Sequence, residues 1–148
     1  MNDMLMELWN RKVKEQDTIY HLGDWAYCSN KPVIYWLSKV SGNKIMIHGS
    51  HDKTMPHPNY QSCILRTSKH TFKLMHNPER NGWQEWIIHG HHHNNHPDIF
   101  PFINGINKTI NVSVELIDYT PIDLDYLESL DINSIKYMKS IHSNIIRW

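Results

Sequence analysis

Hydrophobic and polar residues follow each other along the chain in short blocks, and the spacing changes between that of a helix and that of a strand. Apolar residues recur at helical spacing from Met4 to Val13, which predicts an amphipathic helix. A second helix is predicted from Pro32, a favoured first helical residue, to Val40, because Gly42 follows it closely.

Four β-prone runs end directly before polar residues that can bind metals or transfer protons. The runs over 17–23, 44–48, 71–75 and 86–88 lead, in that order, to Asp24, to Ser50-His51-Asp52, to His76 and to the stretch 89–93. A further run over 63–66 forms a predicted hairpin with 71–75. Ligand-binding residues of α/β sheets lie on loops beyond strand ends, so we expect these side chains to gather there.

The C-terminal part is predicted to contain one strand and one helical tail. Residues from Thr109 to Leu116 alternate between apolar and polar, as a half-buried strand does. From Pro121 an apolar stripe at helical spacing continues to Ile141. The order of elements predicts an α/β sandwich, and the absence of repeats or linkers predicts one domain over residues 1–148.

Composition limits the classes of partner and the compartment. Fifteen basic and fifteen acidic side chains cancel, so overall charge does not indicate a nucleic-acid or membrane-surface partner. No apolar run approaches the ~20 residues that a membrane helix needs. Cys28 and Cys63 are too few for a disulfide framework, and no signal stretch opens the chain, so we expect a cytoplasmic protein.

Histidine is the enriched residue type. The chain has twelve histidines, and five of them lie within residues 89–96. Imidazole binds metals and titrates near neutral pH, so the enrichment indicates metal or acid–base chemistry, although a solvated polar loop is the alternative. On an extended segment His91 and His93 would project to the same side, which suits chelation of one metal or bridging of two.

The order of these elements resembles the calcineurin-like metallophosphoesterases, in particular their small bacterial, archaeal and phage branch. The matching stretches are Tyr-His-Leu-Gly-Asp-Trp at 20–25, Ile-His-Gly-Ser-His-Asp at 47–52, Leu-Met-His-Asn-Pro at 74–78 and Ile-His-Gly-His-His-His at 88–93. A less specific likeness continues through 111–115 and 121–124. The resemblance implies a sandwich of mixed β-sheets flanked by helices.

The resemblance also implies a set of metal ligands. Asp24 is expected to bridge two metal ions, His76 and His91 to complete the second site, and His93 to belong to the first. Ser50 stands where the family has an asparagine ligand, so the second site is expected to be weakened or water-bridged. The ions would be one or two of Mn, Fe, Zn or Ni.

The implied reaction is hydrolysis of phosphomonoesters or phosphodiesters by a metal-bound hydroxide. His51 is expected to stabilise the phosphoryl oxygens or to protonate the leaving alkoxide, and Asp52 to orient His51.

The family's first motif, Asp-x-His, is not found before residue 17, which predicts an N-terminally truncated fold. The strand over 17–23 is then expected either to be a shielded edge or to pair with another chain. That chain would be a second copy or an N-terminal fragment carrying the missing motif.

Two alternatives to a phosphoesterase remain open at this stage. A catalytically degenerate member of the family would serve as a binding or interaction scaffold. A histidine-rich metal-binding protein without phosphate chemistry would explain residues 89–96 but not the Gly-Ser-His-Asp stretch at 49–52. A nuclease is an option within the leading class, but the neutral charge does not indicate a nucleic-acid groove.

Overall fold

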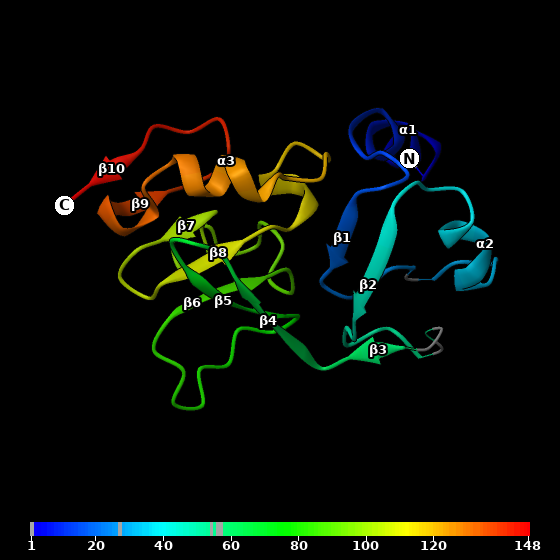
Figure 1. Cartoon of the computed structure of the whole chain (residues 1–148), viewed down its shortest axis with the longest axis horizontal. Coiled ribbons are helices and arrows are strands. Elements are labelled where there is room, and N and C mark those ends of the chain that lie inside the picture. Colours follow the sequence, from blue (N-terminus) through cyan, green and yellow to red (C-terminus); the bar gives the residue numbers. More distant parts are fainter. Residues whose placement is uncertain (1, 27, 54, 56–57) are drawn as a thin grey trace.

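The computed structural model is a mixed α/β arrangement of two β-sheets with few helices, and it describes every residue except 1, 27, 54, 56 and 57 (Figure 1). The smaller sheet is parallel and has the order β1-β2-β3. Its strands are β1 (Thr18–His21), β2 (Asn43–Ile47) and β3 (Asn59–Tyr60). β1 therefore lies at one edge of this sheet, and its pairing with another chain stays a prediction.

The larger sheet has seven strands in the order β10-β9-β7-β8-β6-β5-β4 and mixes parallel with antiparallel pairs. The strands are β4 (Ser62–Arg66), β5 (Thr71–Met75), β6 (Trp86–His89), β7 (Ile103–Asn104), β8 (Thr109–Asn111), β9 (Ile135–Met138) and β10 (Ile146–Arg147). β6 runs parallel to both of its neighbours, β5 and β8, and all four of its residues are buried. This burial explains its almost uninterrupted apolar sequence.

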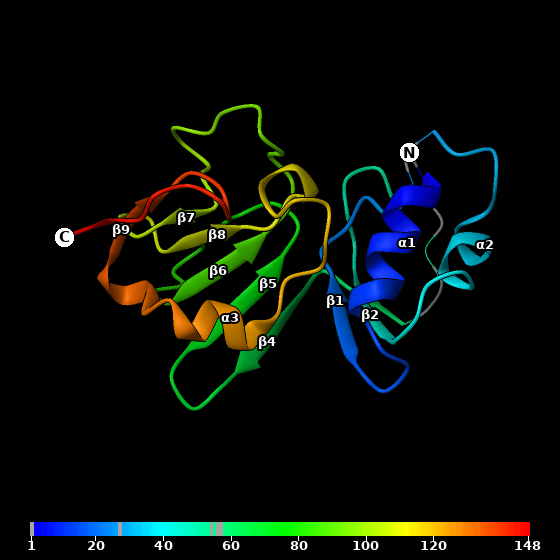
Figure 2. The same ribbon diagram turned by 90° about the horizontal axis from the view of Figure 1, so that it is seen from above.

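The helices lie against the two sheets (Figure 2). α1 (Asn2–Lys12) and α2 (Val33–Leu37) accompany the smaller sheet, and α3 (Leu124–Ser129) accompanies the larger one. Two hydrogen bonds fix α1 to the loop after α2: the Trp9 indole donates to the Ser41 carbonyl at 2.9 Å, and the Asn10 amide donates to the Lys39 carbonyl at 2.8 Å. Every helix among the described residues is too short or too polar to cross a membrane.

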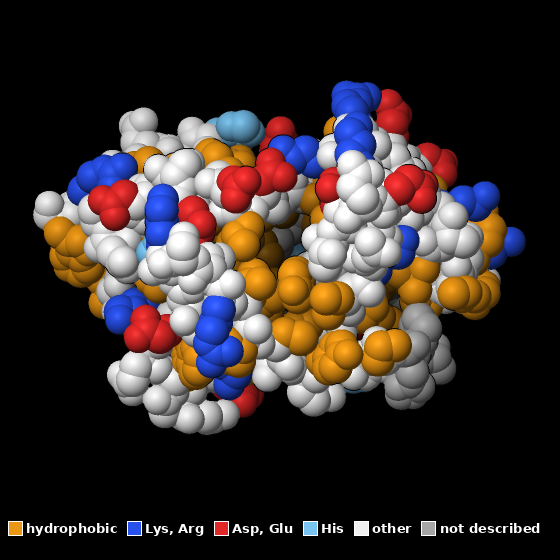
Figure 3. Space-filling view, viewed as in Figure 1, with side chains coloured by type: hydrophobic (Ala, Val, Ile, Leu, Met, Phe, Trp, Pro, Cys, Tyr) orange, Lys and Arg blue, Asp and Glu red, His pale blue; other side chains and the backbone are white. Residues whose placement is uncertain are grey.

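One hydrophobic cluster joins the two sheets. Leu22 and Ile47, at the ends of β1 and β2, belong to the same buried cluster as Phe72, Leu74 and Ile88 of the larger sheet. Figure 3 shows hydrophobic side chains gathered in the middle of one face, where the two parts of the molecule meet. The loops after β1, β2, β5 and β6 are thereby held close together.

The predicted elements of the first ninety residues are confirmed, with the second helix shorter than predicted, whereas the C-terminal predictions are confirmed only in part. The strand predicted over 109–116 ends at Asn111, and a 3-10 helix, η1 (Val114–Leu116), follows it. The predicted helical tail stops after α3 and gives way to η2 (Ile132–Ser134), β9 and β10. Asp131 adopts a left-handed backbone conformation that ends the helix, and β9 pairs with β7, which the sequence did not predict.

Candidate metal centre

Two glycines allow the loops after β1 and β2 to touch. Gly23 has a φ of +96°, and a Cβ atom there would lie 2.6 Å from the Gly49 Cα and 2.7 Å from the His76 Nδ1. A Cβ on Gly49 would collide with the backbone nitrogen and the carboxylate of Asp24. Because no side chain fits at either position, the two glycines set how closely Asp24 approaches His76.

The buried Asp52 carboxylate ties the same two loops together. Its Oδ2 accepts hydrogen bonds from the backbone N–H groups of Gly49 and Asp24, at 2.9 and 2.8 Å. Its Oδ1 accepts one from the Trp25 N–H at 3.0 Å. Asp52 was predicted to orient His51, and these three contacts give it a structural role that the sequence did not indicate. Such a carboxylate stabilises the loop geometry that carries Asp24.

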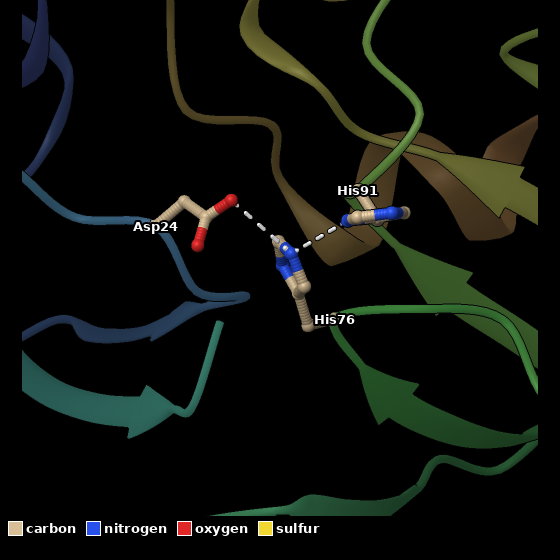
Figure 4. Close-up of side chains that lie close together, drawn as sticks. All are labelled: Asp24, His76 and His91. Carbon is tan, nitrogen blue, oxygen red and sulfur yellow. Dashed lines mark hydrogen bonds and ion pairs between the residues drawn. The ribbon is translucent and has the colours of Figure 1, made fainter. Parts of the chain in front are cut away.

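Asp24 directs its carboxylate toward His76 (Figure 4). Its backbone has a left-handed φ of +56°, a conformation that costs an L-residue ~1–2 kcal/mol. The carboxylate Oδ1 accepts a hydrogen bond from the His51 N–H at 2.7 Å. The other oxygen, Oδ2, lies 3.2 Å from the His76 Nε2 and 3.5 Å from the Ser50 hydroxyl.

His76 follows β5, is buried, and stands between Asp24 and His91 in Figure 4. Its Nδ1 lies 2.8 Å from the carbonyl oxygen of Leu22, which can only accept, so Nδ1 carries a proton. In a neutral His76 the lone pair of Nε2 then faces the Asp24 carboxylate. Two electron-pair donors that converge in this way form a position suited to a cation.

His91 supplies the third donor from the loop after β6. The backbone N–H groups of Gly90 and His91 both donate to the His76 carbonyl, at 3.2 and 3.1 Å, which fixes the two histidines side by side. The His91 Nδ1 lies 2.9 Å from the His76 Nε2. The pKa of His91 is lowered mainly by partial burial and, to a smaller extent, by the neighbouring His76. This favours the neutral imidazole that binds metals.

Asp24, His76 and His91 each offer one ligand atom within 4.8 Å of the others, as the sequence predicted for these three residues. One carboxylate with two imidazoles is a donor set that holds catalytic zinc with a coordination position left open, and it also suits other first-row metals. The Ser50 hydroxyl lies 3.4 Å from the His76 Nε2 and 3.5 Å from the Asp24 Oδ2, so it is close enough to join these donors directly or to hold a water molecule beside them.

His93 lies outside this group of three. Residues 91–94 form a turn instead of the extended segment expected from the sequence, so His91 and His93 do not follow the alternation of a strand. The His93 Nδ1 lies 3.0 Å from the Glu115 Oε1. Glu115 was not predicted as a site residue, because it is far from His93 in the sequence and only the general likeness over 111–115 includes it. The His51 side chain is exposed at the rim of the site.

Two further histidines near the centre are held in the neutral form. His21 packs edge-on against Trp25, at 4.5 Å between ring centroids, and burial lowers its pKa to about 4 against the opposing effect of Asp52. His89 is fully buried at the end of β6. Its pKa is lowered to about 3, mainly by burial and to a smaller extent by His92. Neither ring nitrogen of His89 has a hydrogen-bond partner among the described residues.

A separate cavity of about 230 Å³ contains none of the predicted site residues. It opens beside α1 and is lined by Lys12, Ile117, Asp118, Thr120, Pro121, Ile122, Asp123, Tyr126, Ile141 and His142.

The fold and this site define a mixed α/β protein with a candidate divalent-metal centre beyond its strand ends. The chain is 39% identical over 135 residues to the uncharacterized protein MJ1445 of Methanocaldococcus jannaschii, covering 88% of this chain and 74% of that protein. It belongs to the family of that protein.

A similar fold is found in the crystal structure of the protein of unknown function AQ665 from Aquifex aeolicus. The TM-score is 0.64 and the sequence identity is 23%, over 87% of this chain and 84% of that one. No family model matches the sequence.

Proposed function

We propose that the protein is a metal-dependent phosphoesterase with a calcineurin-like metallophosphoesterase fold, acting on phosphomonoesters or phosphodiesters. The observation that carries the proposal is the meeting of Asp24, His76 and His91 within 4.8 Å, from the ends of three different strands. The same residues stand, in the same chain order, in the stretches that resemble this family. A histidine-rich loop alone would not require Asp24 or the tight contact of Gly23 with Gly49.

The donor set fits one divalent ion of the Mn, Fe, Zn or Ni type. The Asp24 carboxylate, the His76 Nε2 and a ring nitrogen of His91 would hold it. When bound, such an ion acts as a Lewis acid and lowers the pKa of a coordinated water from about 15.7 toward 7, so that hydroxide is available near neutral pH. The Leu22 carbonyl keeps the His76 proton on Nδ1 and thereby keeps Nε2 available as a ligand.

The remaining residues at the site have supporting roles. Asp52 holds the two loops in register through three backbone N–H groups. The imidazole of His51, an exposed residue, would meet the phosphoryl oxygens or protonate the leaving alkoxide. Ser50 is close enough to the donors to orient a water molecule at the open coordination position.

The proposal is tested by reconstituting the chelated protein with each of the four metals and measuring hydrolysis of p-nitrophenyl phosphate and bis(p-nitrophenyl) phosphate. Metal-dependent hydrolysis is expected, and it should be lost together with bound metal in Asp24→Asn and His91→Gln. His142→Gln, which changes an exposed histidine outside the group of three, is the matched control and should behave as wild type. Absence of hydrolysis at full metal occupancy would favour the binding-scaffold alternative.

A further inference from the structure

A second carboxylate–imidazole contact involves His93, which lies on the same turn as His91. The Glu115 Oε1, on η1, is 3.0 Å from the His93 Nδ1. A carboxylate oxygen only accepts, so a neutral His93 in this contact carries its proton on Nδ1. The side chain of Glu115 is 25% exposed, compared with 48% for His93, so the carboxylate is the more enclosed partner. Its other oxygen, Oε2, is buried without a hydrogen-bond partner among the described residues.

We propose that Glu115 is a positioning residue of the metal centre, which holds the His93 imidazole with Nε2 free as an electron-pair donor beside His91. The proposal rests on the proposed function, since His93 matters in this way only if the centre binds a metal. Carboxylates that accept the second ring N–H of a ligating histidine fix its tautomer and orientation and raise its basicity.

The backbone around both partners is held by one buried side chain. Asn111 is fully buried, and its amide nitrogen donates to the carbonyls of His93 and Phe100, both at 3.0 Å. Its amide oxygen accepts from the Ser113 backbone N–H, two residues before Glu115. The Asn111 network therefore fixes the start of η1 and the turn that carries His93 to each other.

His93 also keeps an unfavourable backbone conformation, with a φ of +48°. A left-handed conformation in a residue with a Cβ persists where its surroundings enforce it. Here the hydrogen bond from Asn111 to the His93 carbonyl and the contact with Glu115 act on the same residue. The turn thus presents the His93 ring in one orientation.

Glu115 supplies charge as well as orientation. Asp24 is the one carboxylate in the group of three, so that donor set offers a single negative charge to a divalent ion. His93 lies two residues after His91 on the same turn, so the carboxylate that faces it belongs to the surroundings of the centre. A second carboxylate behind His93 increases the negative charge near the ion and strengthens its binding.

The first test does not require metal. Long-range proton–nitrogen NMR spectra of the metal-free protein at pH 8 report which nitrogen of each imidazole carries the proton. His93 should carry it on Nδ1 in wild type and in Glu115→Gln, whose amide oxygen still accepts, but should show a tautomer mixture in Glu115→Ala. Asp118→Asn, which alters the exposed pair with His142, should leave the His93 signals unchanged. A proton on Nε2 in wild type, or no change in Glu115→Ala, overturns the proposal.

The second test follows cobalt binding by visible absorption. Loss of such a supporting partner costs about 10- to 100-fold in metal affinity, which is the loss expected for Glu115→Ala. Glu115→Gln should lie between that variant and wild type, because it keeps the orientation and loses the charge. Wild-type affinity in Glu115→Ala overturns the positioning role while the proposed function stands. A wild-type protein that binds no cobalt contradicts the proposed function, and the tautomer spectra then decide whether Glu115 orients His93.

Discussion

Acidification should destabilise the protein in part through His89. The ring is fully buried, and neither nitrogen has a hydrogen-bond partner among the described residues, so a proton there would place an unpaired charge in the core. Its nearest described ring neighbours are His92 and Phe100, at 6.0 and 6.1 Å between centroids. The substitution that isolates this effect is His89→Leu. Leucine has a side chain of similar size but is apolar, so the variant removes the titrating group.

The magnitude follows from the two pKa values of His89, 6.5 in the unfolded chain and about 3 in the fold. Between these values the unfolded chain binds a proton that the folded chain does not, so the free energy of unfolding falls as the pH falls. The slope is up to ~1.4 kcal/mol per pH unit, which amounts to ~5 kcal/mol over the whole interval. Well above pH 6.5 both states are neutral and His89 contributes no pH dependence.

Urea denaturation of the chelated protein at pH 7.5, 6.5, 5.5 and 4.5 measures this effect. From pH 6.5 to 4.5, wild type should lose ~2.3 kcal/mol more than His89→Leu, because the slope is only half its full value at pH 6.5. His142→Gln removes an exposed histidine, and its curve should run parallel to that of wild type. Parallel curves for wild type and His89→Leu would refute the assignment of acid sensitivity to this buried ring.

Three further substitutions test the site. His51→Ala should lower turnover about 10²- to 10³-fold with metal content unchanged by elemental analysis, and equal loss of metal would contradict its assignment to the phosphoryl group. Gly49→Ala should cost about 1–3 kcal/mol in urea denaturation and weaken metal binding, because the new methyl group meets the Asp24 carboxylate; unchanged values would show that the loops can separate. Asp52→Asn should destabilise the fold by about 1–3 kcal/mol while Asp118→Asn does not, and equal stabilities would argue against the structural role of Asp52.

The first ninety residues could be predicted because local signals agree there. Each strand that leads to the site is a short apolar run, and glycine or a ligand-type residue marks its end. The apolar residues from Leu124 to Ile141 also recur at helical spacing, so their pattern alone predicts one continuous helix. The helix ends because Asp131 is left-handed and because Ile103 of β7 pairs with Met138 of β9. Long-range pairing of this kind leaves no signal in the local pattern.

The candidate metal-binding residues of the site could be predicted from the sequence, but the contacts that hold them in place could not. Asp24, His76 and His91 were found because their chemistry and their position after strands are both visible in the sequence. The contacts of Asp52 were missed because its partners are backbone N–H donors, which every residue except proline carries and which leave no pattern in the sequence. The pairing of Glu115 with His93 was missed because the two residues lie on separate segments that only the folded sheet brings together.

The central claim is that Asp24, His76 and His91 form a metal centre, and diffraction data collected at the zinc absorption edge from zinc-loaded crystals test it most directly. We predict an anomalous peak bounded by these three side chains, with ligand distances of about 2.0–2.2 Å. The peak should be absent in crystals of His76→Ala prepared in the same way. A zinc peak at another position, or a peak between Asp24 and His91 that persists in His76→Ala, would contradict the claim.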